Sequence, residues 1–428
     1  MIIGKTKSIC PVCLKVLDAD KCTGTDECIY MNKVCPEHGN FSSLIWEGDL
    51  KSYLQWGTEN HANEAPVEPK EGSDGCPFDC GLCTEHQRKG CCMLLELTNR
   101  CNLHCPVCFA SAGDGAVREP DLEEIEKQLD YLMDHGGPFN IQLSGGEPTM
   151  RDDLPEIIRM GKEKGFGFFQ LNTNGIRLAN EAGYAKRLAE AGLNTVFLQF
   201  DGVTDDVFMK IRGKALLETK IRAIENSVCA GLGVVLVPVI IPDVNDHQVG
   251  DIISFAEERM PGVRGVHFQP ISYFGRCDQR RPSQPITIPA MLRLIETQTN
   301  GKMKASDFAG GGAENPYCSF HAAYREGKLL PKKSGNCCCC TTSDDSRENV
   351  ASQWTGEKTE AEDGFDEFMN RVHNTTFEIS GMIFQDAYNF DLERVKRCYI
   401  CEVDSEYGMV PFCAYNLTNE EGKYLYRK

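Results

Sequence analysis

Three cysteines within eight residues constrain this chain most. Cys101, Cys105 and Cys108 have the spacing C-x3-C-x2-C, and we call them the cysteine triplet. They follow the apolar run Met93–Leu97, which we predict to be a short strand. Loops at the carboxyl ends of strands are where α/β barrels build their sites. Three thiolates can hold three irons of a cubane cluster, whereas a full set of protein ligands is four. The spacing therefore predicts a cluster with one open iron.

The composition indicates a large, metal-rich protein. The 428 residues are enough for two or more domains, and no apolar run is long enough to span a bilayer. A net charge of -18 makes nucleic acid and anionic lipid headgroups poor partners. The 23 cysteines cluster in C-x2-C and C-x3-C groups, which metal ligation in a reducing cytoplasm explains better than disulfides do. We therefore expect a cytoplasmic protein without a membrane span, and its N-terminus has no apolar signal core.

Residues 1–48 indicate a small metal-bound module. Cys10-Pro-Val-Cys13 and Cys35-Pro-Glu-His38 are two ligand-bearing turns. Their separation of about 20 residues suits a zinc ribbon or a rubredoxin-like iron site. A structural metal would stabilise so short a segment, and free buried thiols are the alternative. The expected ligands are Cys10, Cys13, Cys35 and one of His38, Cys28 or Cys22.

Residues 49–92 combine a polar segment with a second cysteine group. The part before residue 76 is rich in Glu, Asn, Gly and Pro and is predicted to be a linker. Cys76, Cys80 and Cys83 repeat the C-x3-C-x2-C spacing. Cys91 or Cys92 would complete a four-ligand auxiliary cluster, and a zinc site is the alternative.

Predicted strands and helices alternate from residue 93 to about 300. The clearest helix is Asp121–His135, with its apolar residues on one stripe and Pro120 at its start. Six strands with right-handed helical crossovers indicate an α/β fold, a partial (βα)6 barrel. We find no two further units that would make an eight-stranded barrel. The predicted strands are Met93–Leu97, Asn140–Leu143, Gly167–Leu171, Thr195–Phe200, Val234–Ile241 and Gly265–Gln269.

Polar residues follow several of these strands. The second strand leads into Gly145, Gly146 and Glu147, which we call the Gly-Gly-Glu segment. Its glycines would let the backbone approach a ligand closely, and the glutamate suits a charged amine. The fourth strand ends with Gln199 and Asp201. Each loop alone is only a turn signal, but parallel strands bring all of them to one rim with the cysteine triplet.

Residues 301–428 are expected to form a C-terminal extension with an auxiliary iron–sulfur cluster. Cys398, Cys401 and Cys413 are its predicted ligands, with Cys318 as the first candidate for a fourth. A zinc-stapled cap is the alternative. The four consecutive cysteines 337–340 cannot all face one metal, but two of them could share a site or form a redox pair.

The cysteine triplet and the Gly-Gly-Glu segment together resemble the radical S-adenosylmethionine (SAM) superfamily, and the resemblance covers residues 93–300. It implies a [4Fe-4S] cluster on the triplet, with SAM chelating the open iron and the Gly-Gly-Glu segment contacting the methionine amino group. It also implies that Gln199 and Asp201 meet the ribose. Val107 stands where the family usually has an aromatic residue, and Phe109 follows the last cysteine.

The chain is similar, nearly end to end, to the tetraether lipid synthases and related class D radical SAM methylases, and to a bacterial branch of radical SAM (seleno)proteins. The shared motifs include Cys-Pro-Val-Cys, Cys-Pro-Phe-Asp-Cys-Gly-Leu-Cys and Pro-Phe-Cys-Ala-Tyr-Asn. This similarity implies several metal sites and a substrate with an unactivated C–H bond.

The resemblance also implies the reaction. An electron from the cluster would cleave SAM to methionine and a 5′-deoxyadenosyl radical, which would abstract hydrogen from a small-molecule, lipid or peptide substrate. The electron would come from a low-potential donor such as ferredoxin or flavodoxin. Carbon methylation or carbon–carbon coupling would follow. The alternatives are a peptide or protein maturase and, outside the enzymes, a multi-cluster electron carrier.

Overall fold

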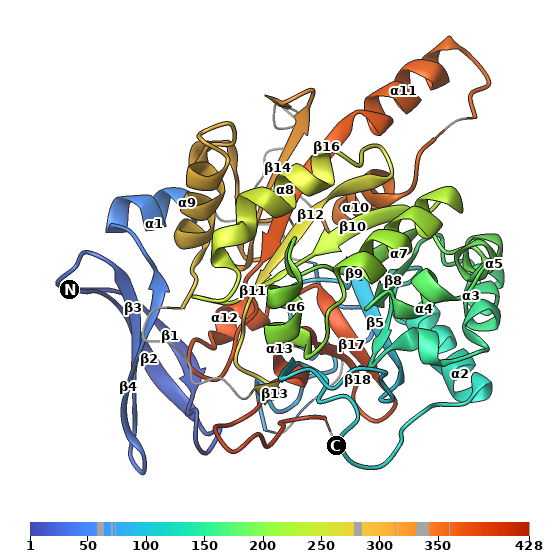
Figure 1. The fold of residues 1–428 in the computed structure, drawn as a ribbon. Helices are drawn as coiled ribbons and strands as arrows, with labels where there is room; N and C mark the ends of the chain where they lie inside the picture. The colour runs from blue at the N-terminus through green and yellow to red at the C-terminus, as the bar shows by residue number, and fades with distance from the viewer. Residues whose placement is uncertain are drawn as a thin grey trace.

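The structure is a computed structural model that describes residues 1–57, 64–69, 72, 74–277, 285–312, 314–330, 342–358 and 360–427. Cysteines 337–340 lie outside the described residues, so their predicted role stays a prediction. Figure 1 shows a small antiparallel sheet at the N-terminus beside a large α/β body, to which the C-terminal segment is joined. In the described part of the chain, no helix has the length and apolar character needed to cross a membrane.

Six parallel strands form the wall of the barrel, as the alternating pattern predicts. They are neighbours in chain order, and each pair is parallel. Pro238 ends the fifth strand early, and two later residues of its predicted range form a separate short strand, β11 (Val239–Ile240). The six strands are β5 (Cys92–Thr98), β7 (Asn140–Gly145), β8 (Phe169–Thr173), β9 (Thr195–Gln199), β10 (Gly233–Val237) and β12 (Val263–Pro270).

Helices connect these strands and pack against them. Helix α2 begins with a capping box, in which Asp121 accepts from the Glu124 backbone and Glu124 accepts from the Asp121 backbone. Gly183, in the left-handed region at φ 74°, comes just before α5, and neither α4 nor α6 was predicted. The helices of the barrel are α2 (Leu122–Asp134), α3 (Leu154–Glu163), α4 (Ile176–Asn180), α5 (Tyr184–Ala191), α6 (Asp205–Arg212), α7 (Leu217–Cys229) and α8 (Val249–Glu257).

The C-terminal segment adds one parallel strand to each edge of the barrel. Strand β16 (Thr376–Met382) pairs with β12, and β17 (Ile400–Asp404) pairs with β5. The parallel sheet therefore has eight strands, although we found only six in the sequence. The two added strands, β16 and β17, belong to no βα repeat. The remaining elements of this region are α9 (Ile288–Gln298), β14 (Ser319–Arg325), β15 (Lys328–Leu329), α10 (Ser343–Trp354), α11 (Gly364–Asn374), α12 (Leu392–Val395), β18 (Gly408–Pro411) and α13 (Phe412–Tyr415).

The N-terminal module is an antiparallel sheet with the order β1-β2-β3-β4. A helix, α1 (Leu50–Trp56), follows it inside the segment that we expected to be a linker. The module is fixed to the C-terminal segment, because Asp391 accepts from Thr6 Oγ1 at 2.7 Å and pairs with Lys21 at 2.7 Å. Its strands are β1 (Ile2–Ile9), β2 (Val16–Thr23), β3 (Ile29–Cys35) and β4 (Gly39–Trp46).

Candidate active site and metal centres

A cavity of about 1280 Å³ lies inside the barrel. The cysteine triplet, the Gly-Gly-Glu segment and Gln199 all line it, so the structure brings together most residues that the sequence placed on one rim. Residues of β16 and β17 line the same cavity, among them Glu378, Ser380 and Ile400. The C-terminal segment is therefore part of the candidate site and not only a cover for it.

The loop that carries the cysteine triplet is held by a short two-stranded sheet. Strand β6 (Val107–Cys108) pairs antiparallel with β13 (Arg276–Cys277). The Arg276 guanidinium donates to the backbone oxygens of Cys105, at 2.9 Å, and of Ala112, at 3.1 Å. These contacts span the loop and fix its backbone before any ligand binds.

Backbone N–H groups point at two of the three sulfurs. Leu103 donates to Cys101 Sγ and Ala112 donates to Cys108 Sγ, each at 3.4 Å. The pKa of the Cys101 thiol is raised to about 12, mainly by burial and in smaller part by the charges of Glu147, Cys105 and Cys108, while the hydrogen bond from Leu103 lowers it. Bound iron would reverse that preference, because a metal ion deprotonates a coordinating thiol. N–H donors aimed at sulfur and thiols that interact with one another fit the ligand set of an iron–sulfur cluster.

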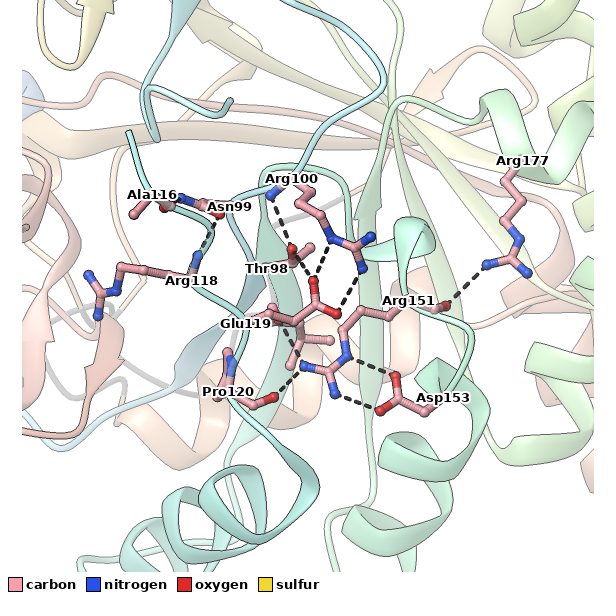
Figure 2. A network of polar contacts seen from close by, with 11 residues as sticks. Thr98, Asn99, Arg100, Ala116, Arg118, Glu119, Pro120, Arg151, Asp153 and Arg177 are labelled. Carbon is pink, nitrogen blue, oxygen red and sulfur yellow. Dashed lines mark hydrogen bonds and ion pairs between the residues drawn. The ribbon is translucent and has the colours of Figure 1, made fainter. Parts of the chain in front are cut away.

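Figure 2 shows the polar network behind this loop. The Glu119 carboxylate accepts from Arg100 Nε at 2.7 Å and from Arg100 Nη2 at 2.8 Å. Arg151 donates to the backbone oxygens of Leu97, at 3.0 Å, and of Pro120, at 2.5 Å. The network ties the end of β5 to the start of α2, and so it fixes the residues just before the triplet.

The two glycines of the Gly-Gly-Glu segment are required by the protein backbone itself. A Cβ atom on Gly145, at φ 119°, would lie 2.3 Å from the Thr98 oxygen, and one on Gly146 would lie 2.3 Å from the Arg100 oxygen. The backbones are bonded at this contact, by Gly146 N to Thr98 O at 2.7 Å and by Glu147 N to Arg100 O at 2.9 Å. We expected the glycines to make room for a ligand, but the close approach is to the strand end that leads into Cys101.

The Glu147 carboxylate joins the ends of two barrel strands. Its Oε1 atom accepts from Thr149 N at 3.1 Å and from the hydroxyls of Thr149 and Thr173, both at 2.6 Å. Its Oε2 atom accepts from Asn174 N at 2.7 Å. A carboxylate offers about four acceptor positions, two on each oxygen. Oε2 can therefore accept one further donor, such as an amine in the cavity.

Asp201 does not have the position that we expected for a ribose contact. It is fully buried and absent from the cavity lining. Both of its oxygens accept from Arg212, by Nε and Nη2, each at 2.7 Å. Burial would lower the pKa of Arg212, but the Asp201 carboxylate and the neighbouring Cys105 thiol raise it. Asp201 therefore positions Arg212, which lines the cavity next to Cys105.

The N-terminal module contains a compact set of metal ligands. The ligand atoms of Cys10, Cys13, Cys35 and His38 all lie within 4.8 Å of one another, and no other such group occurs among the described residues. His38 Nδ1 lies 3.3 Å from Cys35 Sγ and 3.6 Å from Cys10 Sγ. The structure thus selects His38 over Cys22 and Cys28. Three thiols and one imidazole form a complete tetrahedral set for a structural zinc.

Two further sets of cysteines interact electrostatically, although among the described residues neither set has its ligand atoms as close together as those of the N-terminal module. Cys76, Cys80 and Cys83 interact: a hydrogen bond between Cys76 and Cys80 lowers the pKa of the first thiol and raises that of the second. Cys91, the expected fourth ligand, instead packs with Cys92 and Tyr399.

Cys318, Cys398 and Cys413 form the other group. Burial raises the pKa of Cys398 most, and the charges of Cys413, Cys401 and Cys318 add to it. Arg394 Nε donates to Cys318 Sγ at 3.3 Å. Cys401 differs from its prediction, because its side chain packs in the main apolar core with β17 and β18 residues, whereas its neighbour Ile400 lines the cavity.

Two family patterns match parts of this chain. The Radical SAM superfamily pattern matches residues 95–256, and the HMPTM N-terminal zinc ribbon domain pattern matches residues 2–47. The 7,8-dihydro-6-hydroxymethylpterin dimethyltransferase of Methanocaldococcus jannaschii is 35% identical over 97% of this chain and 94% of its own length. The chain belongs to the radical SAM superfamily. It is an enzyme of the transferase type, as the sequence predicted.

Other relatives of this radical SAM enzyme match only part of it. A probable GTP 3′,8-cyclase of Methanothermobacter thermautotrophicus is 35% identical over 41% of this chain and 56% of its own length. The crystal structure of Streptococcus suis SuiB bound to precursor peptide SuiA has a TM-score of 0.43 and 17% identity, and the match covers 50% of this chain and 46% of that one.

We expect the Gly146→Ala substitution to damage the site. The new Cβ would meet the Arg100 oxygen at 2.3 Å, so the Gly-Gly-Glu segment and the cysteine loop must separate. A displacement of this size in a catalytic site lowers rates by roughly 100-fold. The rate of 5′-deoxyadenosine release from SAM measures the effect. Gly167→Ala is the control, because a Cβ there meets nothing within 4 Å. Equal rates for the two variants would contradict the proposed role of the glycine.

We expect Cys35→Ser to remove one zinc ion per chain, because it breaks the four-ligand set of the N-terminal module. Metal analysis of the purified protein measures this directly. Cys22→Ser is the matched control, since Cys22 lies in the same small sheet but outside the group. Loss of zinc from the Cys22 variant, with zinc retained by the Cys35 variant, would reverse our assignment.

Proposed function

We propose that this radical SAM enzyme methylates a carbon atom of a reduced pterin. The observation that carries the proposal is the end-to-end similarity to a 7,8-dihydro-6-hydroxymethylpterin dimethyltransferase, over 97% of this chain. That match includes the C-terminal segment, whose strands β16 and β17 form part of the cavity wall. Similarity along the whole wall supports a related substrate more strongly than similarity in the barrel alone.

Cys101, Cys105 and Cys108 would hold the [4Fe-4S] cluster, and the cavity beside them would hold SAM. The cluster, when bound, supplies the single electron that cleaves SAM. The N–H groups of Leu103 and Ala112 offset negative charge on the sulfurs. The free acceptor position on Glu147 suits the SAM amino group, as the resemblance to the superfamily implies. The barrel wall excludes water from the reacting carbon.

Arg212 contributes a fixed positive charge in this cavity. The bidentate pair with Asp201 holds its guanidinium beside Cys105. A guanidinium in that place suits an anionic group of SAM, such as its carboxylate. Gln199, which also lines the cavity, keeps its predicted role as a ribose contact.

Two auxiliary [4Fe-4S] clusters are the best account of the remaining cysteine groups. Cys318, Cys398 and Cys413 would hold one, with Arg394 offsetting the charge of the thiolates. Cys76, Cys80 and Cys83 would hold the other. Such clusters would pass electrons from a low-potential donor such as ferredoxin or flavodoxin. The 19 described cysteines are all free, which supports our expectation of a reducing cytoplasm.

The proposal predicts a pterin product. The protein, reconstituted anaerobically with iron and sulfide, is incubated with SAM, dithionite and 7,8-dihydro-6-hydroxymethylpterin, together with a cell extract as the source of any further one-carbon donor. We expect 5′-deoxyadenosine and a pterin heavier by one or two methyl groups in the mass spectrum. Replacing the three triplet cysteines with alanine should abolish both products. Peptide and lipid substrates are the comparison, and modification of either instead of the pterin would refute the proposal.

The auxiliary assignment predicts a change in iron content. Cys413→Ala should lower the iron of the reconstituted protein by up to four atoms per chain, because it removes one of three clustered ligands. Cys401→Ala, close by in the chain but packed in the apolar core, should leave the iron unchanged. Iron counting with Mössbauer spectroscopy distinguishes the two. Loss of iron from the Cys401 variant alone would show that our ligand set is wrong.

A further inference from the structure

One carboxyl group faces the cavity without a complete set of partners. Glu378, on β16, lines the cavity, and its Oε2 atom is buried with no hydrogen-bond partner. The Trp354 side chain lies near the carboxyl group, where it lowers the pKa of Glu378. Burial raises the pKa of Glu378 to about 7, and the nearby Arg264 offsets part of this rise. The Arg264 guanidinium donates to three backbone oxygens, those of Pro261, Gln353 and His373.

Burying a carboxyl oxygen without a hydrogen-bond partner costs folding free energy, and more so for a charged group than for a neutral one. A ligand that donates a hydrogen bond to this oxygen would remove that cost. Arg264 does not meet this need, because its donors are directed at the backbone. The carboxyl group therefore has an open acceptor position that faces the same cavity as the cysteine triplet.

Glu378 stands at one end of a row of residues across the barrel. The strand register places Asn172 beside Phe197, Phe197 beside Val235, Val235 beside Gly265 and Gly265 beside Glu378. Asn172, Phe197 and Glu378 line the cavity. Gly265 has no side chain, and a Cβ atom there would lie 2.1 Å from the Glu378 backbone oxygen, so β12 and β16 pack closely beside the carboxyl group.

Aromatic rings line the same cavity as Glu378. The ring of Phe197 lies 4.8 Å from that of Trp354 and 5.4 Å from that of His267, measured between centroids. His267 is bonded to Ser380 Oγ at 3.0 Å, and burial lowers its pKa to about 4, so the imidazole is neutral near pH 7. A flat, uncharged ring system packs well against such a group of rings.

The two features define one class of ligand. A 2-amino-4-oxopyrimidine ring, the recognition edge of a pterin, presents two parallel N–H donors, from the 2-amino group and from the ring nitrogen beside it. A carboxylate accepts such a pair of donors with its two oxygens. The rest of the bicyclic ring is flat and suits the aromatic border. A lipid chain has no donor for the carboxyl group.

We propose that Glu378 anchors the aminopyrimidine edge of the substrate, with the pterin ring lying against Phe197 and Trp354. The inference rests on the proposed function and adds to it the residues that select the ring. The cysteine triplet lines the same cavity, so the anchored pterin and the proposed cluster would share one cavity. Glu378 is in this view a binding residue that decides which substrate enters the reaction.

The test is a binding measurement on the reconstituted holoenzyme with SAM but without reductant, so that no turnover occurs. Anaerobic fluorescence titration gives the dissociation constants of 7,8-dihydro-6-hydroxymethylpterin and of its analogue without the 2-amino group. We expect the wild-type protein to prefer the pterin by about 10- to 100-fold, as for a hydrogen bond to a charged group. Glu378→Gln should weaken pterin binding by a similar factor and remove the preference.

Glu362→Gln is the matched control, because Glu362 is an exposed glutamate of the same C-terminal segment. Iron content and SAM affinity show whether the Glu378 variant is folded. If it does not fold, the wild-type preference decides, and equal affinity for the two ligands overturns the inference. Equal pterin affinity in the wild-type protein and a folded Glu378 variant also overturns it, while the proposed function stands. If the wild-type protein binds no pterin at all, the proposed function fails with it.

Discussion

The backbone contact between the Gly-Gly-Glu segment and the end of β5 is the interaction on which the site depends. Two hydrogen bonds, from Gly146 and Glu147 to the Thr98 and Arg100 oxygens, hold two neighbouring strand ends at a distance that no side chain would permit. The residues proposed to bind the cluster and those proposed to bind SAM are therefore placed by a single rigid contact. The side-chain network of Glu119 and Arg151 supports it from behind.

The C-terminal segment contributes to the barrel, to the cavity and to the N-terminal module. It extends the parallel sheet at both edges, lines the cavity and supports the N-terminal module through Asp391. It also contributes three cysteines of one proposed auxiliary cluster. The match to the probable GTP 3′,8-cyclase covers 41% of this chain, whereas the match to the dimethyltransferase covers 97% and so includes the C-terminal segment.

Much of this arrangement could be predicted from the sequence because it follows local rules. The apolar runs predicted the six strands, and the position of the triplet directly after the first of them predicted that it follows β5 and lines the cavity. The predictions that differ from the structure concern side-chain partners, because these depend on which face of a strand a residue occupies. Cys401 is in a strand where alternate residues face opposite sides, and Ile400 takes the cavity side. Asp201 lies just after the barrel strand β9. Its partner Arg212 is on the short helix α6, which we did not predict from the sequence.

The two edge strands, β16 and β17, come late in the sequence, so they are the last parts of the cavity wall to be synthesised. The ribosome makes the cysteine triplet early, but the strand that pairs with β5 begins only at Ile400. At the usual speed of translation, the remaining chain takes roughly 15–60 s to appear. During this interval the nascent barrel lacks one wall, and its thiols are open to the surroundings. The wall of the cavity that the cysteine triplet lines is therefore complete only after β17 has paired with β5.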